Sequence, residues 1–104
     1  MNLFDIMDYL NYRQLYLSQQ EETVIYLGYH LKLTKSEYKI LKVIMQKPKN
    51  PISAEQIAIL SGLDCNKENI VYHISMINSK AKVIGNRILI KNIAKKGYFL
   101  NDKM

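Results

Sequence analysis

The sequence is poor in residues that several classes of protein require. Cys65 is its one cysteine, which excludes an intramolecular disulfide and a cysteine-based zinc site. No apolar run approaches the roughly 20 residues that cross a bilayer. The N-terminal segment carries Asp5 and Asp8 but lacks the basic residues that begin a secretory signal peptide. We therefore expect a cytoplasmic protein that does not enter a membrane.

Motifs that support catalysis or cofactor binding are also missing. The chain has no glycine-rich phosphate loop, no clustered metal ligands and no catalytic carboxylate pair. His73 and Ser75 are close in sequence, but on a helix they diverge by about 200° around the axis. The sequence thus predicts no enzyme activity, no cofactor and no metal site.

Acidic residues are scarce in one part of the chain. Residues 1–65 contain seven basic and seven acidic residues, which cancel. Residues 66–104 contain eight basic residues and two acids, Glu68 and Asp102, so this end carries the whole net charge of +6. A concentrated basic surface is typical of proteins that bind nucleic acids.

The middle of the chain predicts two helices with recognisable ends. Thr34 and Glu37 have the spacing of a capping box at the start of the first helix, and Pro48 ends it. A second capping box at 53–56 starts a shorter helix, which Gly62 closes. The first of these helices has one apolar stripe, formed by Tyr38, Leu41, Ile44 and Met45.

A third helix is predicted over 67–81. Its apolar stripe, expected to be buried, consists of Ile70, Ile74, Ile77 and Ala81. Its opposite face presents Tyr72, Ser75, Met76 and Ser79.

Five short runs are rich in the β-branched and aromatic residues that strands prefer. They lie at 14–17, 23–27, 29–33, 87–93 and 98–100. The first three predict an antiparallel meander, and the last two a hairpin with a basic turn at 94–97. The expected fold class is α+β, a winged helix-turn-helix with three helices, an N-terminal antiparallel sheet and a C-terminal β-hairpin wing.

We place this winged-helix domain at 14–104 and treat 1–13 as a leader segment. Apolar residues at 3, 4, 6, 7 and 10 stand among acids, which is compatible with a short amphipathic helix over 3–12. Such a helix would serve docking or self-association; a frayed leader is the alternative.

Four stretches resemble the effector domain of bacterial response regulators of the OmpR/PhoB type. They are 28–41, 52–57, 70–80 and 90–100, in matching order, and the likeness covers about 14–100. The resemblance implies that the third helix enters the major groove and that the wing lies on the adjacent backbone or minor groove. It also implies that the loop between the first two helices faces RNA polymerase. No phosphoacceptor receiver precedes the domain in this sequence, so we expect a regulator without one.

The chain departs from that family at positions that usually read bases. Ser75, Met76, Asn78 and Ala94 stand where the family usually has arginine. The family's residues are retained at His73, Lys80, Gly97 and Tyr98. Readout of guanine by arginine is therefore not expected.

The sequence predicts a sequence-preferring regulator of transcription that binds double-stranded DNA. Small, hydroxylic and apolar side chains on the third helix would touch thymine methyls and donate a hydrogen bond to either base type, while lysines neutralise phosphates. We expect salt-sensitive binding that favours A·T-rich DNA through groove shape. The predicted DNA-binding residues are Asn69, Tyr72, His73, Ser75, Met76, Ser79, Lys80, Lys91, Asn92, Lys95, Lys96 and Tyr98.

The alternative is a winged-helix interaction module that has lost specific DNA binding. Its partner would be a protein such as RNA polymerase or another regulator. A homodimer is compatible with the resemblance, because members of that class often bind direct repeats head to tail.

Overall fold

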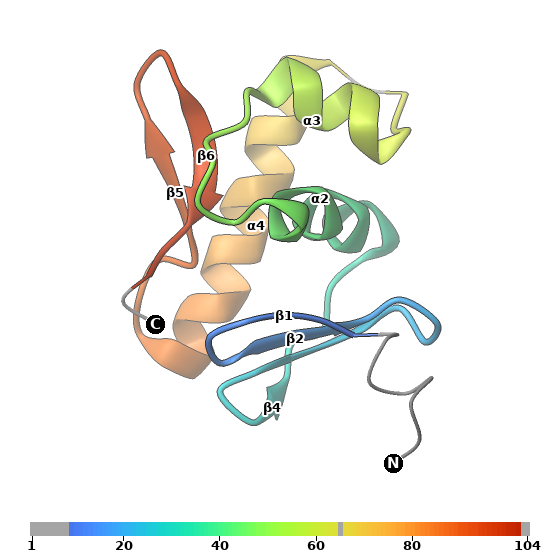
Figure 1. Ribbon diagram of the computed structural model, residues 1–104, viewed down its shortest axis with the longest axis vertical. Helices are drawn as coiled ribbons and strands as arrows, with labels where there is room; N and C mark the ends of the chain where they lie inside the picture. Colours follow the sequence, from blue (N-terminus) through green and yellow to red (C-terminus); the bar gives the residue numbers. More distant parts are fainter. Residues whose placement is uncertain (1–8, 65, 103–104) are drawn as a thin grey trace.

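The computed structural model of the chain describes residues 9–64 and 66–102. Within them, an antiparallel sheet with strand order β1-β2-β3-β4 is followed by three helices and a two-stranded hairpin (Figure 1). The strands are β1 (Tyr9–Tyr12), β2 (Leu15–Ser18), β3 (Thr23–Tyr26), β4 (Tyr29–His30), β5 (Ile90–Ile93) and β6 (Gly97–Leu100). The helices are α2 (Lys35–Gln46), α3 (Ala54–Ser61) and α4 (Lys67–Gly85). The predicted α+β winged helix-turn-helix is confirmed.

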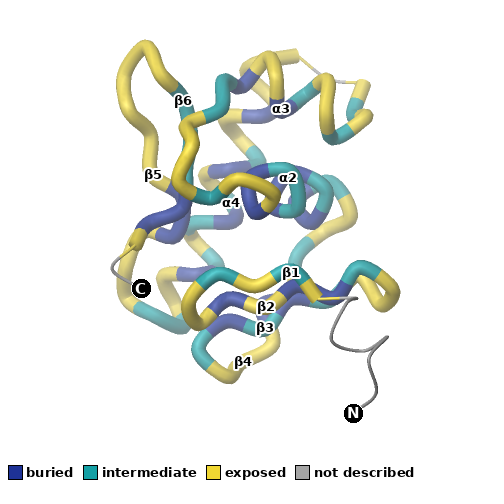
Figure 2. Tube along the Cα trace, in the orientation of Figure 1, coloured by how far each residue is buried: buried dark blue, intermediate teal, exposed yellow. Residues whose placement is uncertain are grey.

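The four-stranded sheet covers one end of the helical layer. Figure 1 shows the helices on one side of this sheet. Leu15 pairs with Tyr26 and Leu17 with Val24 across the central strands, and all four side chains are buried. In β2, exposed Tyr16 stands between buried Leu15 and Leu17. This period of two fixes which face of the sheet packs against the helices. Figure 2 shows buried segments in the sheet and in the helices that it faces.

Strand β1 corrects the prediction for the start of the chain. Residues 9–12, expected as the end of a helix within the 1–13 leader, pair antiparallel with β2 from Tyr9↔Ser18 to Tyr12↔Leu15. Leu10 and Tyr12 pack on the core, so these residues follow a strand period and belong to the sheet. Pairing with a neighbouring strand has outweighed the local helical pattern. The rest of that predicted helix, residues 3–8, lies outside the described residues.

The predicted capping box of α2 is present, whereas of the one predicted at 53–56 the structure shows only the N-cap bond of Ser53. The Thr34 hydroxyl accepts a hydrogen bond from the Glu37 amide at 3.2 Å, and the Glu37 carboxylate accepts one from the Thr34 amide at 2.9 Å. This reciprocal pair is a complete capping box. At α3, the Ser53 hydroxyl accepts from the Gln56 amide at 3.1 Å. Gly62 ends α3 in the left-handed conformation, with φ 73°.

Helix α4 is longer than predicted. Its buried stripe of Ile70, Ile74, Ile77 and Ala81 is the expected one, but the helix continues to Gly85 and ends at Asn86. At Gly85 a Cβ atom would collide with the side chains of Tyr26 and Leu27, so a residue without a side chain lets the last turn approach the sheet. No helix in the described ranges has the length and apolar character needed to cross a lipid bilayer.

Candidate nucleic-acid interface

One face of α4 points away from the core. Tyr72, with 59% of its surface accessible, and Ser75 and Ser79 are exposed on the side opposite the buried stripe. Met76 beside them is half-buried, and Asn69 is exposed in the first turn. The structure thus brings together the neutral face that the sequence predicted.

The wing is attached to the loop between α2 and α3. The Tyr98 amide donates to the Ile52 carbonyl at 2.8 Å, and the Ile52 amide donates to the Tyr98 carbonyl at 2.9 Å. Gly97 lies against this bridge with φ 121°, and a Cβ there would overlap the backbone of Ile52 and Ser53. Glycine is therefore required at the base of β6.

A second attachment joins the wing to α4. The Asn78 side chain donates from Nδ2 to the Ile90 carbonyl at 3.0 Å and accepts at Oδ1 from the Ile90 amide at 2.8 Å. Asn78 therefore fixes the start of β5 and does not occupy the base-reading role of the family's arginine. This role could not be predicted from the sequence, because no local pattern reveals a partner 12 residues away.

A groove of about 340 Å³ separates α4 from the wing. Ser75, Ser79 and Lys82 line it from the helix, and Asn92 and Tyr98 line it from the hairpin. Lys82 lies beyond the predicted end of the helix at residue 81 and is therefore absent from the predicted DNA-binding residues. If the predicted helix had been one turn longer, the spacing of three residues would have placed Lys82 on the same face as Ser79.

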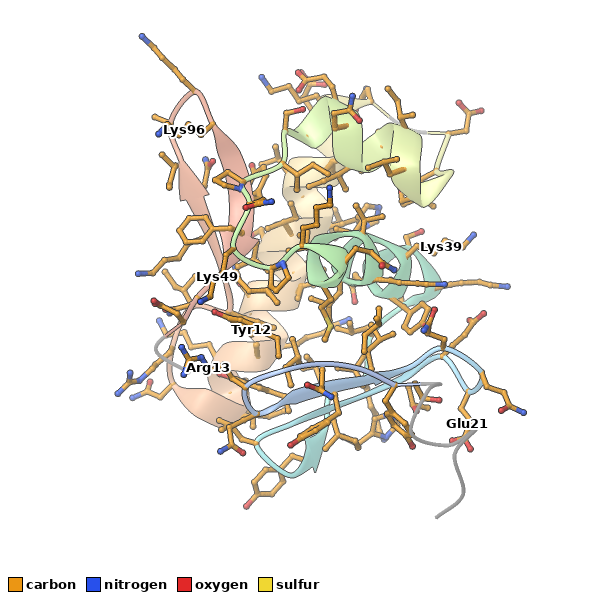
Figure 3. The ribbon with its side chains drawn as sticks, viewed as in Figure 1. Tyr12, Arg13, Glu21, Lys39, Lys49 and Lys96 are labelled. Carbon is orange, nitrogen blue, oxygen red and sulfur yellow. The ribbon has the colours of Figure 1, made fainter. Side chains whose placement is uncertain are left out.

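The wing tip borders a second, smaller hollow of about 270 Å³ that extends to the start of α3. Lys95 and Lys96 line it from the tip and Lys67 from α4. Lys67 approaches Glu55 at 3.7 Å, but both side chains are mostly exposed, so this ion pair is weak. Lys96 extends from the tip into solvent (Figure 3), and Lys91 on β5 is exposed as well.

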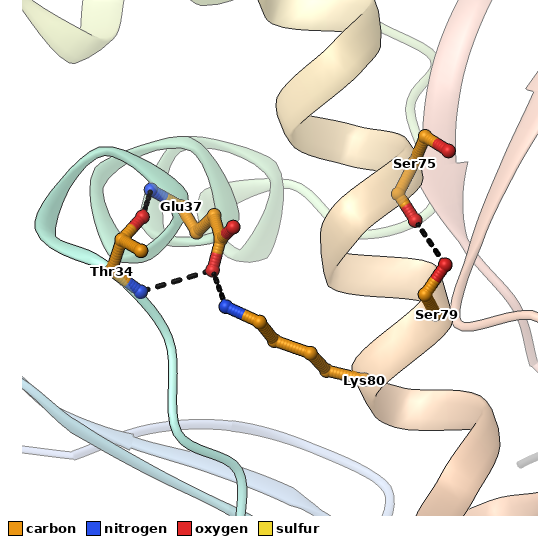
Figure 4. Close-up of polar contacts among 5 residues, drawn as sticks. All are labelled: Thr34, Glu37, Ser75, Ser79 and Lys80. Carbon is orange, nitrogen blue, oxygen red and sulfur yellow. Dashed lines mark hydrogen bonds and ion pairs between the residues drawn. The ribbon is translucent and has the colours of Figure 1, made fainter.

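One predicted contact residue is paired inside the domain, and another is partly buried. Lys80 places Nζ 2.6 Å from Oε1 of Glu37, the buried carboxylate that also caps α2 (Figure 4). Its charge is balanced within the domain, so we do not retain Lys80 as a phosphate contact. His73 is half-buried, and its Nδ1 atom is buried without a hydrogen-bond partner in the described part of the chain.

Nothing in this arrangement resembles a metal centre. Among residues 9–64 and 66–102, no three His, Cys, Asp or Glu side chains converge as metal ligands would. The interface instead consists of a helix face, a hairpin and the groove between them.

No protein-family profile matches the sequence, and no curated protein shows significant similarity to it. Solved structures are similar. The DNA-binding domain of the response regulator AdeR, solved in complex with an intercistronic region, has a TM-score of 0.80 at 20% identity, over 89% of this chain and 98% of that one. The DNA-binding domain of CpxR from E. coli has a TM-score of 0.73 at 22% identity, over 88% of this chain and 94% of that one.

A longer protein shares the fold as well. The response regulator DrrB, a Thermotoga maritima OmpR/PhoB homolog, has a TM-score of 0.75 at 21% identity, over 90% of this chain. The chain spans 44% of DrrB, so the likeness concerns less than half of that protein. At these identities similarity establishes the fold, and this chain has the winged helix-turn-helix fold of the DNA-binding domains of OmpR/PhoB-type response regulators.

Proposed function

We propose that this chain is a sequence-preferring, double-stranded DNA-binding regulator of transcription that acts in the cytoplasm. In this proposal α4 enters the major groove, and the wing lies on the adjacent backbone or minor groove. The observation that carries the proposal is a neutral, exposed helix face that lies across one groove from a lysine-rich hairpin. The DNA complex of the AdeR domain supports it, because that domain has the same fold.

The two sides of the groove suit different parts of a duplex. A major groove about 12 Å wide admits an α-helix, whose side chains can reach base edges. Lys91, Lys95 and Lys96 on the hairpin and Lys82 on α4 would neutralise phosphates, which supplies affinity and register without sequence information. These two roles, base contact and phosphate contact, require binding and no catalysis.

Fluorescence anisotropy over a salt series tests the proposal. We expect Lys95→Glu combined with Lys96→Glu to weaken DNA binding at least tenfold and to reduce the log–log salt slope by about 2, since each phosphate contact contributes about 0.9. The matched control is Lys32→Glu combined with Lys35→Glu, which changes the net charge equally at two exposed positions, one before α2 and one at its first residue. Equal losses in both variants would show that only net charge matters, and an absence of binding at low salt would refute the proposal.

A second candidate function is a protein-interaction module. A hollow of about 670 Å³ lies between α2, α3 and their connecting loop, with Val43, Ile52 and Leu60 among its apolar lining residues. Lysines surround it, at positions 39, 42 and 47. This combination would fit an acidic segment with apolar side chains, from RNA polymerase or another regulator.

Titration with purified RNA polymerase separates the two candidates. Leu60, 60% exposed at the hollow, would become Leu60→Asp; this variant should lose polymerase binding and keep DNA binding if both surfaces function. Polymerase binding without DNA binding in the unmodified protein would favour the second candidate alone.

A further inference from the structure

Ser79 is an exposed residue whose single hydroxyl proton is engaged within the helix. Its Oγ atom lies 3.0 Å from the carbonyl oxygen of Ser75 (Figure 4). A carbonyl oxygen can only accept a hydrogen bond, so Ser79 is the donor. The hydroxyl therefore offers its lone pairs, and no proton, to an external partner.

This restriction selects among bases. In the major groove, the amino groups of adenine N6 and cytosine N4 donate hydrogen bonds, whereas guanine O6 and N7 and thymine O4 accept them. An acceptor-only Ser79 matches adenine or cytosine and is mismatched to guanine. The sequence alone had left this hydroxyl free to donate.

The neighbouring side chains favour A·T pairs elsewhere in the same short element, through the methyl group of thymine. Tyr72 is exposed, and its ring is held by an edge contact with the His73 ring, with centroids 5.6 Å apart. Half-buried Met76 extends this apolar surface. An apolar surface is complementary to the C5-methyl group of thymine, which a C·G pair lacks.

Between Tyr72 and Ser79 the helix carries no lysine or arginine for guanine, and Lys82, one turn further on, is assigned to phosphates. Between Lys67 and Lys82, all of which the structure describes, the one basic side chain other than histidine is Lys80. Its ammonium group is bound to Glu37.

We infer that α4 reads A·T pairs in the major groove, where Ser79 accepts a hydrogen bond from adenine N6 and Tyr72 covers a thymine methyl. Seven residues separate the two side chains, about 10.5 Å along the helix, which corresponds to about three base pairs. The recognised element is a short A·T run. This inference rests on the proposed function, and it assigns the A·T preference to the major groove rather than to groove shape.

Four duplexes of equal length, compared by anisotropy at one salt concentration, separate these readouts. They are an A·T duplex, the same duplex with deoxyuridine in place of thymidine, and the corresponding I·C and G·C duplexes. Deoxyuridine removes the methyl group alone, whereas I·C keeps the minor groove of A·T but has the major groove of G·C. We expect the A·T duplex to bind best, deoxyuridine to weaken binding about fourfold per methyl contacted, and I·C to behave like G·C.

Variants test the role of Ser79. Ser79→Ala should weaken binding to the A·T duplex about three- to tenfold, with an unchanged salt slope. Replacing adenine by purine, which lacks the 6-amino group, should weaken binding of the unmodified protein but not of Ser79→Ala. Ser61→Ala is the matched control, because Ser61 also donates to a backbone carbonyl, that of Ala58 at 3.2 Å, but lies on α3. It should leave binding unchanged.

The outcomes keep this inference distinct from the proposed function. Equal binding of the I·C and A·T duplexes would place the preference in the minor groove and overturn the inference, while DNA binding stands. Equal binding of all four duplexes would overturn it in the same way. No binding to any duplex would refute the proposed function itself.

Discussion

The ammonium group of Lys80 forms an ion pair inside the protein. Oε1 of Glu37 accepts hydrogen bonds from both the Lys80 ammonium group and the Thr34 amide, and the Glu37 side chain is 4% exposed. The ion pair therefore links α4 to the first turn of α2. A buried carboxylate is stable there only while its partners remain.

We expect Lys80→Met to lower the free energy of unfolding by about 2–3 kcal/mol. Loss of one partner from a fully buried ion pair costs about 3–5 kcal/mol, and the 31% exposure of Lys80 reduces that cost. Urea denaturation measures the change. The double variant Lys80→Met with Glu37→Gln should recover part of the loss, because no unpaired charge remains; no recovery would argue against the ion pair as the cause.

Tyr26 is a buried residue whose hydroxyl has no hydrogen-bond partner among the described residues. An unpartnered buried hydroxyl is destabilising. We expect Tyr26→Phe to raise the free energy of unfolding by about 1 kcal/mol in thermal or urea denaturation. Tyr16→Phe, at an exposed position of the same sheet, should change nothing; a destabilised Tyr26→Phe protein would indicate an important interaction of this hydroxyl.

The burial of Tyr26 also leads us to expect a loss of stability in alkali. Burial raises the pKa of Tyr26 above its ordinary value of 10.0, and Arg87 opposes this by lowering it. Above pH 10 the unfolded chain therefore loses this proton more readily than the folded protein does, so stability falls as the pH rises. Denaturation at pH 9 and pH 11 should show a smaller fall for Tyr26→Phe than for the unmodified protein.

At the level of elements, the stability of the wing depends on its attachments to the rest of the domain. A two-stranded hairpin is marginally stable alone. Here the Ile52–Tyr98 bridge fixes β6, and the Asn78 side chain fixes β5 through Ile90. These two attachments set the distance between the wing and α4, and hence the width of the groove between them.

We expect Gly97→Ala to destabilise the domain by about 3 kcal/mol. A methyl group at this position would overlap the backbone of Ile52 and Ser53, in addition to the strain at φ 121°. Gly62→Ala is the control, since φ is also positive there but the space around it is open; it should cost about 1 kcal/mol. Thermal denaturation gives both values, and faster hydrogen exchange of the Tyr98 amide would report release of the wing. Equal costs would contradict a role for the close contact.

The sequence predicted those elements whose signals are local. The capping residues Thr34 and Ser53 correctly located the starts of α2 and α3, because a helix cap depends on neighbouring residues. Strand β1 was mistaken for part of a helix, since its character depends on pairing with β2. The last turn of α4 was missed although Ile84, three residues beyond Ala81, continues the apolar stripe and packs against the core.

The same contrast between local and long-range signals applies to the candidate site. The exposed face of α4 was predictable, because a helical period places Tyr72 and Ser79 opposite the buried stripe. The internal roles of Asn78 and Lys80 were not, since their partners lie 12 and 43 residues away in sequence. Such pairs form only through the tertiary fold.

At the scale of the whole molecule, the fold reduces the effective charge of the basic end. Of the eight basic residues in 66–104, Lys80 is paired internally and Lys67 lies near Glu55. Lys82, Lys91, Lys95 and Lys96 are exposed around α4 and the wing.

We therefore expect DNA binding to have a log–log salt slope of about −3.6, which corresponds to four phosphate contacts at about 0.9 each. Anisotropy between about 50 and 200 mM salt measures it. A slope near −7 would mean that all eight basic residues act on DNA, and would contradict the internal assignment of Lys80.

The bridge between Ile52 and Tyr98 gives the wing a second connection. Ile52 also lines the large hollow between α2 and α3, so one short piece of backbone borders both surfaces. A protein segment bound in the hollow and a duplex bound to the wing would then each affect the conformation of the same piece of backbone at Ile52. Any cooperativity between them must be reciprocal: the factor by which DNA tightens or weakens the partner's binding is the factor by which the partner changes the binding of DNA.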